Sequence, residues 1–203
     1  MRHGWGKRVF DVTVALVLVI VTLPVLATVA AVVWMGSGRP ILFGHRRLGR
    51  DGRLFRCWKF RTMTVDAERR LDRDPHLKAQ HRTNGFKLPN GDDPRVTRVG
   101  RWLRRSYVDE LPQLFNVLNG TMSLVGPRPI VPEELECFGP QAHELLAIKP
   151  GIIGAWTALG GDRPDYPERA GLELAYVREH TWAWDLAILV RSVPVVLRGE
   201  ENG

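Results

Sequence analysis

Cysteine is scarce in this sequence of 203 residues, and the two that occur, Cys57 and Cys137, lie far apart. They form no C-x-x-C pair and have no nearby histidine partner. This pattern argues against a disulfide framework and against a zinc site. It favours a reducing, cytosolic setting.

Acidic residues are in the minority, with 22 Asp and Glu against 29 Lys and Arg, which gives a formal net charge of +7. Such an excess favours nucleic acid, an anionic membrane surface or phosphorylated substrates as partners. Composition does not choose among the three. The length favours one domain with a small appendage over two full domains.

Charge is absent altogether from residues 12 to 35, where Val, Leu, Ala and Ile dominate. About 20 such residues are enough to span a bilayer as a helix. Two alternatives stay open with less weight. A buried core helix is disfavoured because soluble domains of this size seldom bury a helix that is apolar all round. A cleaved signal peptide is disfavoured because the run is too long and no A-x-A site closes it.

Pro24 lies in the middle of this run, where a proline removes a backbone donor and kinks or breaks a helix. Basic residues stand on both sides of the run, at positions 2, 7, 8, 39, 46, 47, 50 and 53. Because basic flanks face the cytoplasm, both ends are expected on the same side of the membrane. We therefore prefer a re-entrant helical hairpin in residues 1–38 to a straight span, with Asp11 at the level of the headgroups.

Residues 39–203 are expected to form a cytoplasmic, membrane-associated domain of α+β class that is mostly helical. The expected elements are a small hairpin of strands at 41–43 and 54–60, helices at 65–81, 95–105, 169–180 and 182–190, and a loop at 83–94 that can close over a site. The helix at 95–105 suits an anionic membrane surface or an ordinary core equally well. The tryptophans of the helix at 182–190 suit a membrane interface, although that helix can also pack into the core.

Two adjacent carboxylates, Asp109 and Glu110, stand among arginines in residues 104–129. A helix that starts at Asp109 places Pro112 in its first turn, where proline is tolerated, whereas a start capped by Ser106 leaves Pro112 too far inside. At the positive end of the helix dipole a carboxylate stays ionised and phosphate is attracted. An ionised Asp can act as a nucleophile, and a simple acidic N-cap is the competing interpretation.

Two prolines hold Arg128 in a stiff backbone, so its guanidinium is presented with little freedom left to lose. A planar guanidinium with several N–H donors is well suited to bind a phosphate group. Lys59 and Arg61 stand on either side of an aromatic residue, and by themselves they indicate no more than solvated charges at a strand end.

Six motifs occur in a distinctive order along nearly the whole chain. They are KRVFD at 7–11, KFRTM at 59–63, DPRVT at 93–97, DELPQL at 109–114, SLVGPRP at 123–129 and KPG at 149–151. In this order they resemble the bacterial sugar transferases, the monotopic polyprenyl-phosphate phosphoglycosyl transferases. The likeness is to the catalytic domain of the large exopolysaccharide-priming enzymes, without their multi-span N-terminal part.

The resemblance implies that a UDP-sugar gives its phosphosugar to polyprenyl (undecaprenyl) phosphate and releases UMP, as the priming step of surface glycan synthesis. Asp109 would attack the sugar-bearing phosphate and form a covalent intermediate, which gives ping-pong kinetics. Mg²⁺ would be held by Asp109, with Glu110 as a weaker second ligand or a base toward the acceptor. Arg104 and Arg128, and with less weight Lys59 and Arg61, would bind phosphate.

The resemblance also implies a re-entrant helix broken near a proline, and hence a monotopic protein on the cytoplasmic face of the bacterial inner membrane. Its partners would be membrane lipid and the two substrates but no nucleic acid, with a homo-oligomer left open. This chain departs from the family at residues 154–161, which read GAWTALGG where members often have GLWQVSGR. Arg163 is the candidate to replace the lost arginine in nucleotide or sugar recognition.

Two other functions compete with transfer. A non-catalytic basic membrane protein that binds anionic lipid or nucleic acid predicts steep salt dependence and no loss on changing Asp109. A two-carboxylate glycoside hydrolase is disfavoured, because adjacent residues rarely flank one glycosidic bond from opposite sides. Which sugar is transferred does not follow from the sequence.

Overall fold

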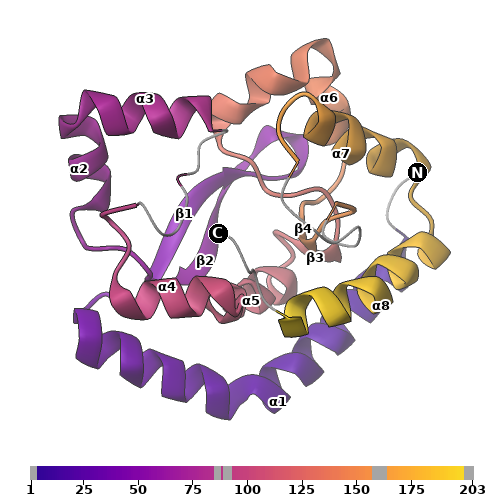
Figure 1. Cartoon of the computed structure of the whole chain (residues 1–203). Helices are drawn as coiled ribbons and strands as arrows, with labels where there is room; N and C mark the ends of the chain where they lie inside the picture. The colour runs from indigo at the N-terminus through magenta and orange to yellow at the C-terminus, as the bar shows by residue number, and fades with distance from the viewer. Residues whose placement is uncertain (1–3, 85–87, 89–92, 157–163, 199–203) are drawn as a thin grey trace.

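Helices dominate the computed structural model, which describes residues 4–84, 88, 93–156 and 164–198 (Figure 1). The α-helices are α1 (Trp5–Ser37), α2 (Ala67–Arg73), α3 (Pro75–Thr83), α4 (Arg98–Arg105), α5 (Gln113–Leu118), α6 (Ala142–Leu145), α7 (Glu168–Glu179) and α8 (Trp182–Arg198). The strands are β1 (Leu42–Leu48), β2 (Leu54–Phe60), β3 (Ser123–Val125) and β4 (Gly151–Ile153). The described residues also contain three 3₁₀ segments: η1 (Arg50–Gly52), η2 (Val108–Glu110) and η3 (Pro132–Gln141). The expected mostly helical α+β class is confirmed.

The apolar run forms one helix of 33 residues, α1, which continues through Pro24. Its ribbon bends in its middle part (Figure 1), as expected where a proline removes one hydrogen bond of the ladder. At 1.5 Å per residue it is about 50 Å long. Within the described part of the chain, α1 is the one helix long and apolar enough to cross a membrane by length and composition.

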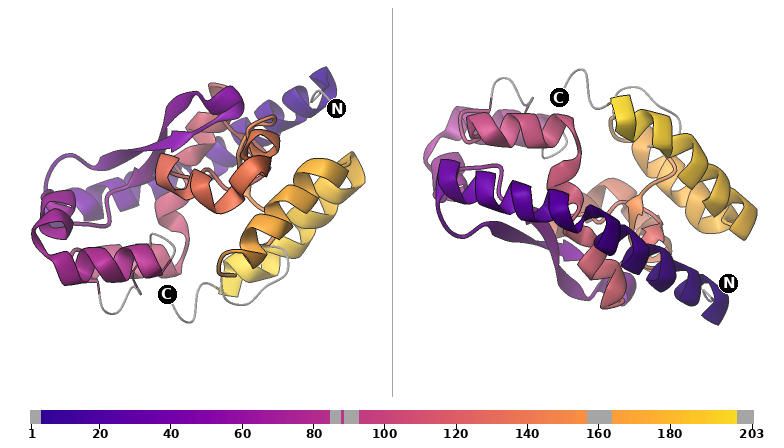
Figure 2. Two further views of the ribbon diagram at one scale, coloured as in Figure 1. Left: turned by 90° about the horizontal axis from the view of Figure 1, so that it is seen from above. Right: turned by 90° about the horizontal axis from the view of Figure 1, so that it is seen from below.

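α1 is buried against the rest of the protein in two stretches, one in each half of the helix. Lys7, Asp11 and Ala15 are buried in the first half and Leu26, Val29 and Val33 in the second, whereas residues 16–25 are exposed or partly exposed. Seen from below, α1 crosses the molecule with α4 beside one half and α8 beside the other (Figure 2). The helix is thus anchored at both ends of its length.

Different cores receive the two halves of α1. Leu26, Val29 and Val33 pack with Phe60 of β2 and Leu103 of α4. Ala15 belongs to a second cluster, which includes Leu114 and Val117 of α5, Leu124 of β3 and Ile188 of α8. Asp11, which is expected at the level of the headgroups, directs its side chain into the protein, and its depth in the membrane stays a prediction. Its side chain is buried, and it accepts hydrogen bonds from the Ser123 hydroxyl at 2.8 Å and the Leu124 N–H at 3.3 Å.

The two sheets have two strands each. β1 and β2 form the expected antiparallel hairpin, with Leu42 opposite Phe60 and Leu48 opposite Leu54, and its first strand is longer than predicted. β3 and β4 pair in parallel. The side chain of Asn116 ties the hairpin to α5: its oxygen accepts the Trp58 N–H at 2.9 Å and its nitrogen donates to the Arg56 carbonyl at 2.8 Å.

Helix boundaries differ from the expectations where local capping intervenes. The single helix expected at 65–81 is two helices, because Pro75 opens α3 and Asp74 caps it by accepting the Leu77 N–H at 3.0 Å. α4 begins at Arg98, capped by Thr97. α8 extends eight residues beyond its predicted end at 190, and most of the expected loop at 83–94 lies outside the described residues.

The helix predicted to start at Asp109 begins instead at Gln113. Tyr107 adopts a left-handed backbone with φ of 54°, a single 3₁₀ turn (η2) follows, and Pro112 is the N-cap residue of α5. Pro112 has no N–H to continue a hydrogen-bonded ladder through this point. Asp109 and Glu110 therefore lie in a tight turn before the helix and not in its first turn.

Candidate active site

One face of the hairpin is directed toward the carboxylates. His45 is opposite Cys57 and Phe43 is opposite Lys59, so these four side chains share a face of the sheet. Lys59, near the end of β2, forms an ion pair with Glu110 of η2. Their side chains are 25% and 22% exposed, so the pair is reachable by a ligand but shielded from bulk water.

The pKa values of the two adjacent carboxyl groups are shifted in opposite directions. Asp109 is 5% exposed, and burial raises its pKa to about 6, with Glu110 adding to the rise while Lys59 and Arg104 oppose it. Burial also works against ionised Glu110, but Lys59 and Arg128 outweigh it and lower its pKa to about 2. Asp109 is therefore the more basic carboxylate, and Glu110 is a fixed anion. The expectation that a helix dipole favours ionised Asp109 is wrong: the helix begins at Gln113, and burial disfavours the ionised form of Asp109.

Arg104 reaches the site from the last turn of α4. Its Nε donates to the Thr62 hydroxyl at 3.0 Å, and its charge lowers the pKa of Asp109. This approach depends on Gly100, because a Cβ at that position would lie 2.0 Å from the Thr62 carbonyl oxygen. Beside it, Arg95 makes a fork to the Asp93 carboxylate with two bonds of 2.8 Å.

Arg128 approaches from the loop after β3. Burial tends to lower its pKa, but the carboxylates of Glu110 and Glu134 outweigh that effect and raise it. The guanidinium is thus close enough to Glu110 for their charges to interact. The structure brings Asp109, Glu110, Lys59, Arg104 and Arg128 into one cluster, and their roles in catalysis and phosphate binding stay predictions.

Arg61 has a different main contact from the one expected. Its NH2 group donates to the carbonyls of Ser37 and Gly38, the latter at 2.8 Å, and so binds the carboxyl end of α1. Within the described residues its Nε and NH1 are buried and have no hydrogen-bond partner. Phosphate binding by Arg61 stays a prediction, now with two donors that could serve it.

The sequence reasoning missed His45 and Arg47 of β1. Within the described residues the Nδ1 of His45 has no hydrogen-bond partner, and burial, with Arg47 and Lys59, lowers its pKa to about 4. His45 is therefore neutral at physiological pH. Strand periodicity extended to residue 48 would have placed His45 and Arg47 on the same face as Lys59.

The donor set fits a magnesium ion only with help from a substrate. Among the described residues, no group of three or more His, Cys, Asp or Glu side chains could hold a metal. Two adjacent carboxylates are enough where substrate phosphates and water supply the other ligands. The altered loop at 154–161 and Arg163 cannot be placed here, because residues 157–163 lie outside the described part.

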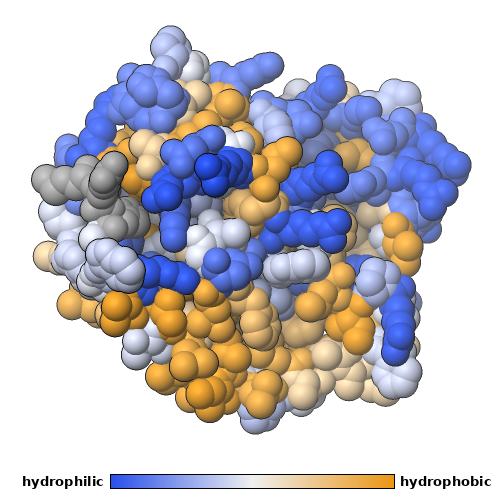
Figure 3. Space-filling view, turned by 180° about the vertical axis from the view of Figure 1, so that it is seen from behind, coloured by the Kyte–Doolittle hydropathy of each residue, from blue (hydrophilic) through white to orange (hydrophobic). Residues whose placement is uncertain are grey.

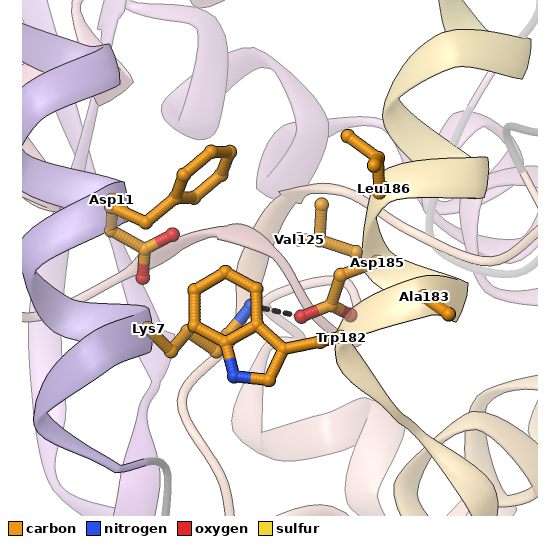
Figure 4. A pocket seen from close by; sticks show the side chains of 8 residues that line it. Lys7, Asp11, Val125, Trp182, Ala183, Asp185 and Leu186 are labelled. Atoms are coloured by element: carbon orange, nitrogen blue, oxygen red, sulfur yellow. Dashed lines mark hydrogen bonds and ion pairs between the residues drawn. The ribbon is translucent and has the colours of Figure 1, made fainter.

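A cavity of about 260 Å³ lies elsewhere, between α1 and α8 (Figure 4). Lys7 and Asp11 of α1 face Trp182 and Asp185 of α8 across it. Its charged groups are already engaged: Lys7 pairs with Asp185, and Asp185 also accepts the Tyr176 hydroxyl at 2.6 Å. None of the carboxylates and cations clustered around Asp109 lines this cavity, so it is a junction between helices.

Known proteins share this sequence over almost its whole length. A profile of the family described as bacterial sugar transferase matches residues 2–199. The undecaprenyl-phosphate galactose phosphotransferase of Salmonella typhimurium is 42% identical over 196 residues, which cover 95% of this chain and 40% of that protein. The undecaprenyl-phosphate glucose phosphotransferase of Komagataeibacter xylinus is 37% identical over 207 residues, covering 96% of this chain and 35% of that protein.

A shorter relative is matched over most of its own length. The exopolysaccharide production protein ExoY of Sinorhizobium fredii is 40% identical over 197 residues, which cover 95% of this chain and 86% of that protein. The chain thus spans well under half of the Salmonella and Komagataeibacter relatives and most of the Sinorhizobium one. Because the family profile covers nearly every residue, including the whole charged cluster around Asp109, this chain belongs to the bacterial sugar transferase family.

Proposed function

We propose that the protein transfers a phosphosugar from a UDP-sugar to polyprenyl phosphate and releases UMP, as the priming step of surface glycan synthesis. The observation that carries this proposal is the buried Asp109, whose pKa is raised to about 6 beside a fixed Glu110–Lys59 pair and two arginines. The cations Lys59, Arg104 and Arg128 around the two carboxylates suit a diphosphate substrate. The names of the relatives, which act on undecaprenyl phosphate with galactose or glucose, support the same reaction.

The reaction proceeds in two displacements at one phosphorus atom. An oxygen of Asp109 attacks the sugar-bearing phosphorus, the bond from that phosphorus to the bridging oxygen breaks, and UMP leaves with this oxygen. An oxygen of polyprenyl phosphate then attacks the same phosphorus and the bond to Asp109 breaks. The products are the lipid diphosphate sugar and the regenerated carboxylate.

The neighbouring charges take separate roles in this scheme. Arg104 and Arg128 offset the charge that develops on the phosphoryl oxygens. Glu110 has a pKa of about 2, which makes it a poor base and a good permanent partner for Lys59. Mg²⁺ would be held by Asp109, with Glu110 as second ligand, and it would supply charge neutralisation on the diphosphate.

The protein is further proposed to be monotopic, with both ends of α1 on the cytoplasmic face of the inner membrane. Three contacts support this placement: Lys7 pairs with Asp185, Arg8 donates to the Val117 and Leu118 carbonyls, and Arg61 binds the carboxyl end of α1. A straight span would carry one end of α1 about 30 Å across the hydrocarbon and break the contacts at that end. Hydrophobic residues gather over the lower part of the molecule, where α1 lies (Figure 3), so residues 16–25 would enter the lipid.

UMP release tests the transfer. The purified protein is incubated with a panel of labelled UDP-sugars, undecaprenyl phosphate and Mg²⁺, and UMP is measured. At least one donor should give UMP, and Asp109→Asn should abolish it, whereas the matched control Asp72→Asn, at an exposed position, should not. Without acceptor, the wild type alone should gain the mass of a phosphosugar. Absence of UMP with every donor, together with intact lipid binding in Asp109→Asn, would favour the non-catalytic basic membrane protein.

Reporter tags test the membrane placement. Tags on the amino and carboxyl ends of the chain should both be cytoplasmic, because both ends of α1 are held by the same domain. A tag found outside the membrane would refute the re-entrant arrangement in favour of a span.

A further inference from the structure

The loop that carries Arg128 is held by hydrogen bonds to its backbone from residue 126 to residue 131. Three of its contacts come from backbone groups of neighbouring elements: Gly126 N–H to Ile153 O at 3.1 Å, Gly151 N–H to Pro127 O at 2.9 Å and Leu48 N–H to Ile130 O at 2.9 Å. The other three come from charged side chains: Arg128 N–H to Glu173, Arg47 to Pro129 O at 3.2 Å and Val131 N–H to Glu134 at 3.3 Å. The loop is therefore held as a rigid element.

Glu173 is the member of this set that touches Arg128 itself. It lies on α7, its residue is 1% exposed, and its two carboxylate oxygens are 3.3 and 3.2 Å from the Arg128 nitrogen. Because Pro127 and Pro129 have no N–H, this is the one backbone donor of the three residues. Glu173 thus binds the central donor of the stiff segment.

Burying a carboxylate is costly, and the surroundings of Glu173 supply compensation. Arg128 is one nearby cation, since the charge of Glu173 contributes to raising its pKa. Arg169 lies one helical turn earlier on α7 and is fully buried, with its guanidinium 3.7 Å from Glu134 and 5.0 Å from the centre of the Tyr166 ring. Glu134 in turn lies 3.8 Å from Arg47. Alternating charges thus connect α7 to both sides of the Arg128 loop.

We propose that Glu173 is a positioning residue for transfer, which fixes the angle at which Arg128 presents its guanidinium to the substrate phosphate. Glu173 faces the backbone of Arg128 and acts through it, so it is not a catalytic residue. This inference rests on the proposed role of Arg128 in phosphate binding. It assigns a part in the reaction to α7, a helix that carries none of the clustered carboxylates and cations.

A double-mutant cycle separates positioning from simple core packing. Glu173→Gln keeps the size of the side chain and removes its charge, and a misplaced Arg128 should lower kcat/KM for UMP release about 100-fold. In an Arg128→Ala background the same change should alter the residual rate by no more than about twofold, because the group it positions is gone. Glu168→Gln, at an exposed position on the same helix, should leave the rate unchanged.

Hydrogen exchange gives a readout that does not need activity. In Glu173→Gln the Arg128 amide, the single exchangeable backbone site of residues 127–129, should exchange faster, and in Glu168→Gln it should not. If the Arg128 amide exchanges faster in Glu173→Gln but the wild-type protein makes no UMP, the proposed function is refuted and the contact between Glu173 and Arg128 stands. Additive losses in the cycle, or unchanged exchange, would overturn the positioning role. If Glu173→Gln does not fold, Glu173→Asp keeps the charge and takes its place in both measurements.

Discussion

Replacing Asp109 by asparagine should stabilise the protein at neutral pH while it abolishes transfer. Burial holds the pKa of this carboxyl at about 6 in the folded protein, against an ordinary value of 3.8. At about 1.4 kcal/mol for each pH unit, the ionised carboxylate costs the folded state about 3 kcal/mol at neutral pH. Asparagine has nearly the same shape and carries no charge, so it removes this cost.

The sign of the effect fixes its pH dependence. A pKa raised by folding means that the folded protein binds protons more tightly, so stability is greatest below pH 4 and declines as pH rises through about 6. The gain from Asp109→Asn should therefore be nearly absent at pH 4 and complete at pH 7.5. For a chain of this length, 3 kcal/mol corresponds to an increase of about 6 to 12 °C in the melting temperature.

Thermal unfolding in detergent at pH 4 and at pH 7.5 measures this effect, with UMP release measured on the same samples. Asp72→Asn, which removes an exposed carboxylate paired with Lys78, serves as the control and should change the melting temperature little. An Asp109→Asn protein that is inactive but no more stable than the wild type at pH 7.5 would refute the reasoning. It would mean that Lys59 and Arg104 fully compensate the buried charge.

Three further changes probe the contacts around the site. UMP release should decline on the acid side with an apparent pKa of about 6. Lys59→Met should move this acid limb of the pH profile to higher pH, because it removes a cation that favours the ionised form of Asp109. An unmoved limb would contradict the assignment of this pKa to Asp109. Asn116→Ala should destabilise the protein by about 1 to 3 kcal/mol in thermal unfolding, since it leaves the partly buried backbone N–H of Trp58 and carbonyl of Arg56 without their partner. Arg61→Met should speed amide exchange at residues 34–38 without unfolding α7, and equal exchange would show that the contact with α1 is dispensable.

Local patterns were sufficient to predict much of this site. The apolar run gave α1, alternation and turn residues gave the hairpin, and the proline-flanked Arg128 was expected to face phosphate. The start of the helix after Asp109 was mispredicted because a left-handed Tyr107 permits a separate 3₁₀ turn, and no residue type at that position signals it. Tyr107 thus departs from the negative φ that residues other than glycine usually adopt.

Long-range pairings were beyond this reasoning for a physical reason. Glu173 reaches Arg128 across 45 positions of the chain, and Lys7 reaches Asp185 across 178. Neither pairing produces a periodic pattern in the sequence, because a charged residue that is buried in a helix cannot be told from a solvated one until its partner is known. Only the tertiary fold distinguishes the buried Glu173 from the exposed Glu168 on the same helix.

The end of β2 connects α1 to the clustered carboxylates through four consecutive residues. Lys59 pairs with Glu110, Phe60 packs against Leu26, Val29 and Val33 of α1, Arg61 binds the carboxyl end of α1, and Thr62 accepts from Arg104. Residues that face the site and residues that face the helix thus occupy a segment about 10 to 14 Å long. If α1 enters the lipid as proposed, this segment sets the height of Asp109 above the bilayer. A lipid phosphate at the headgroup level and a soluble nucleotide sugar can then reach the same carboxylate from opposite sides.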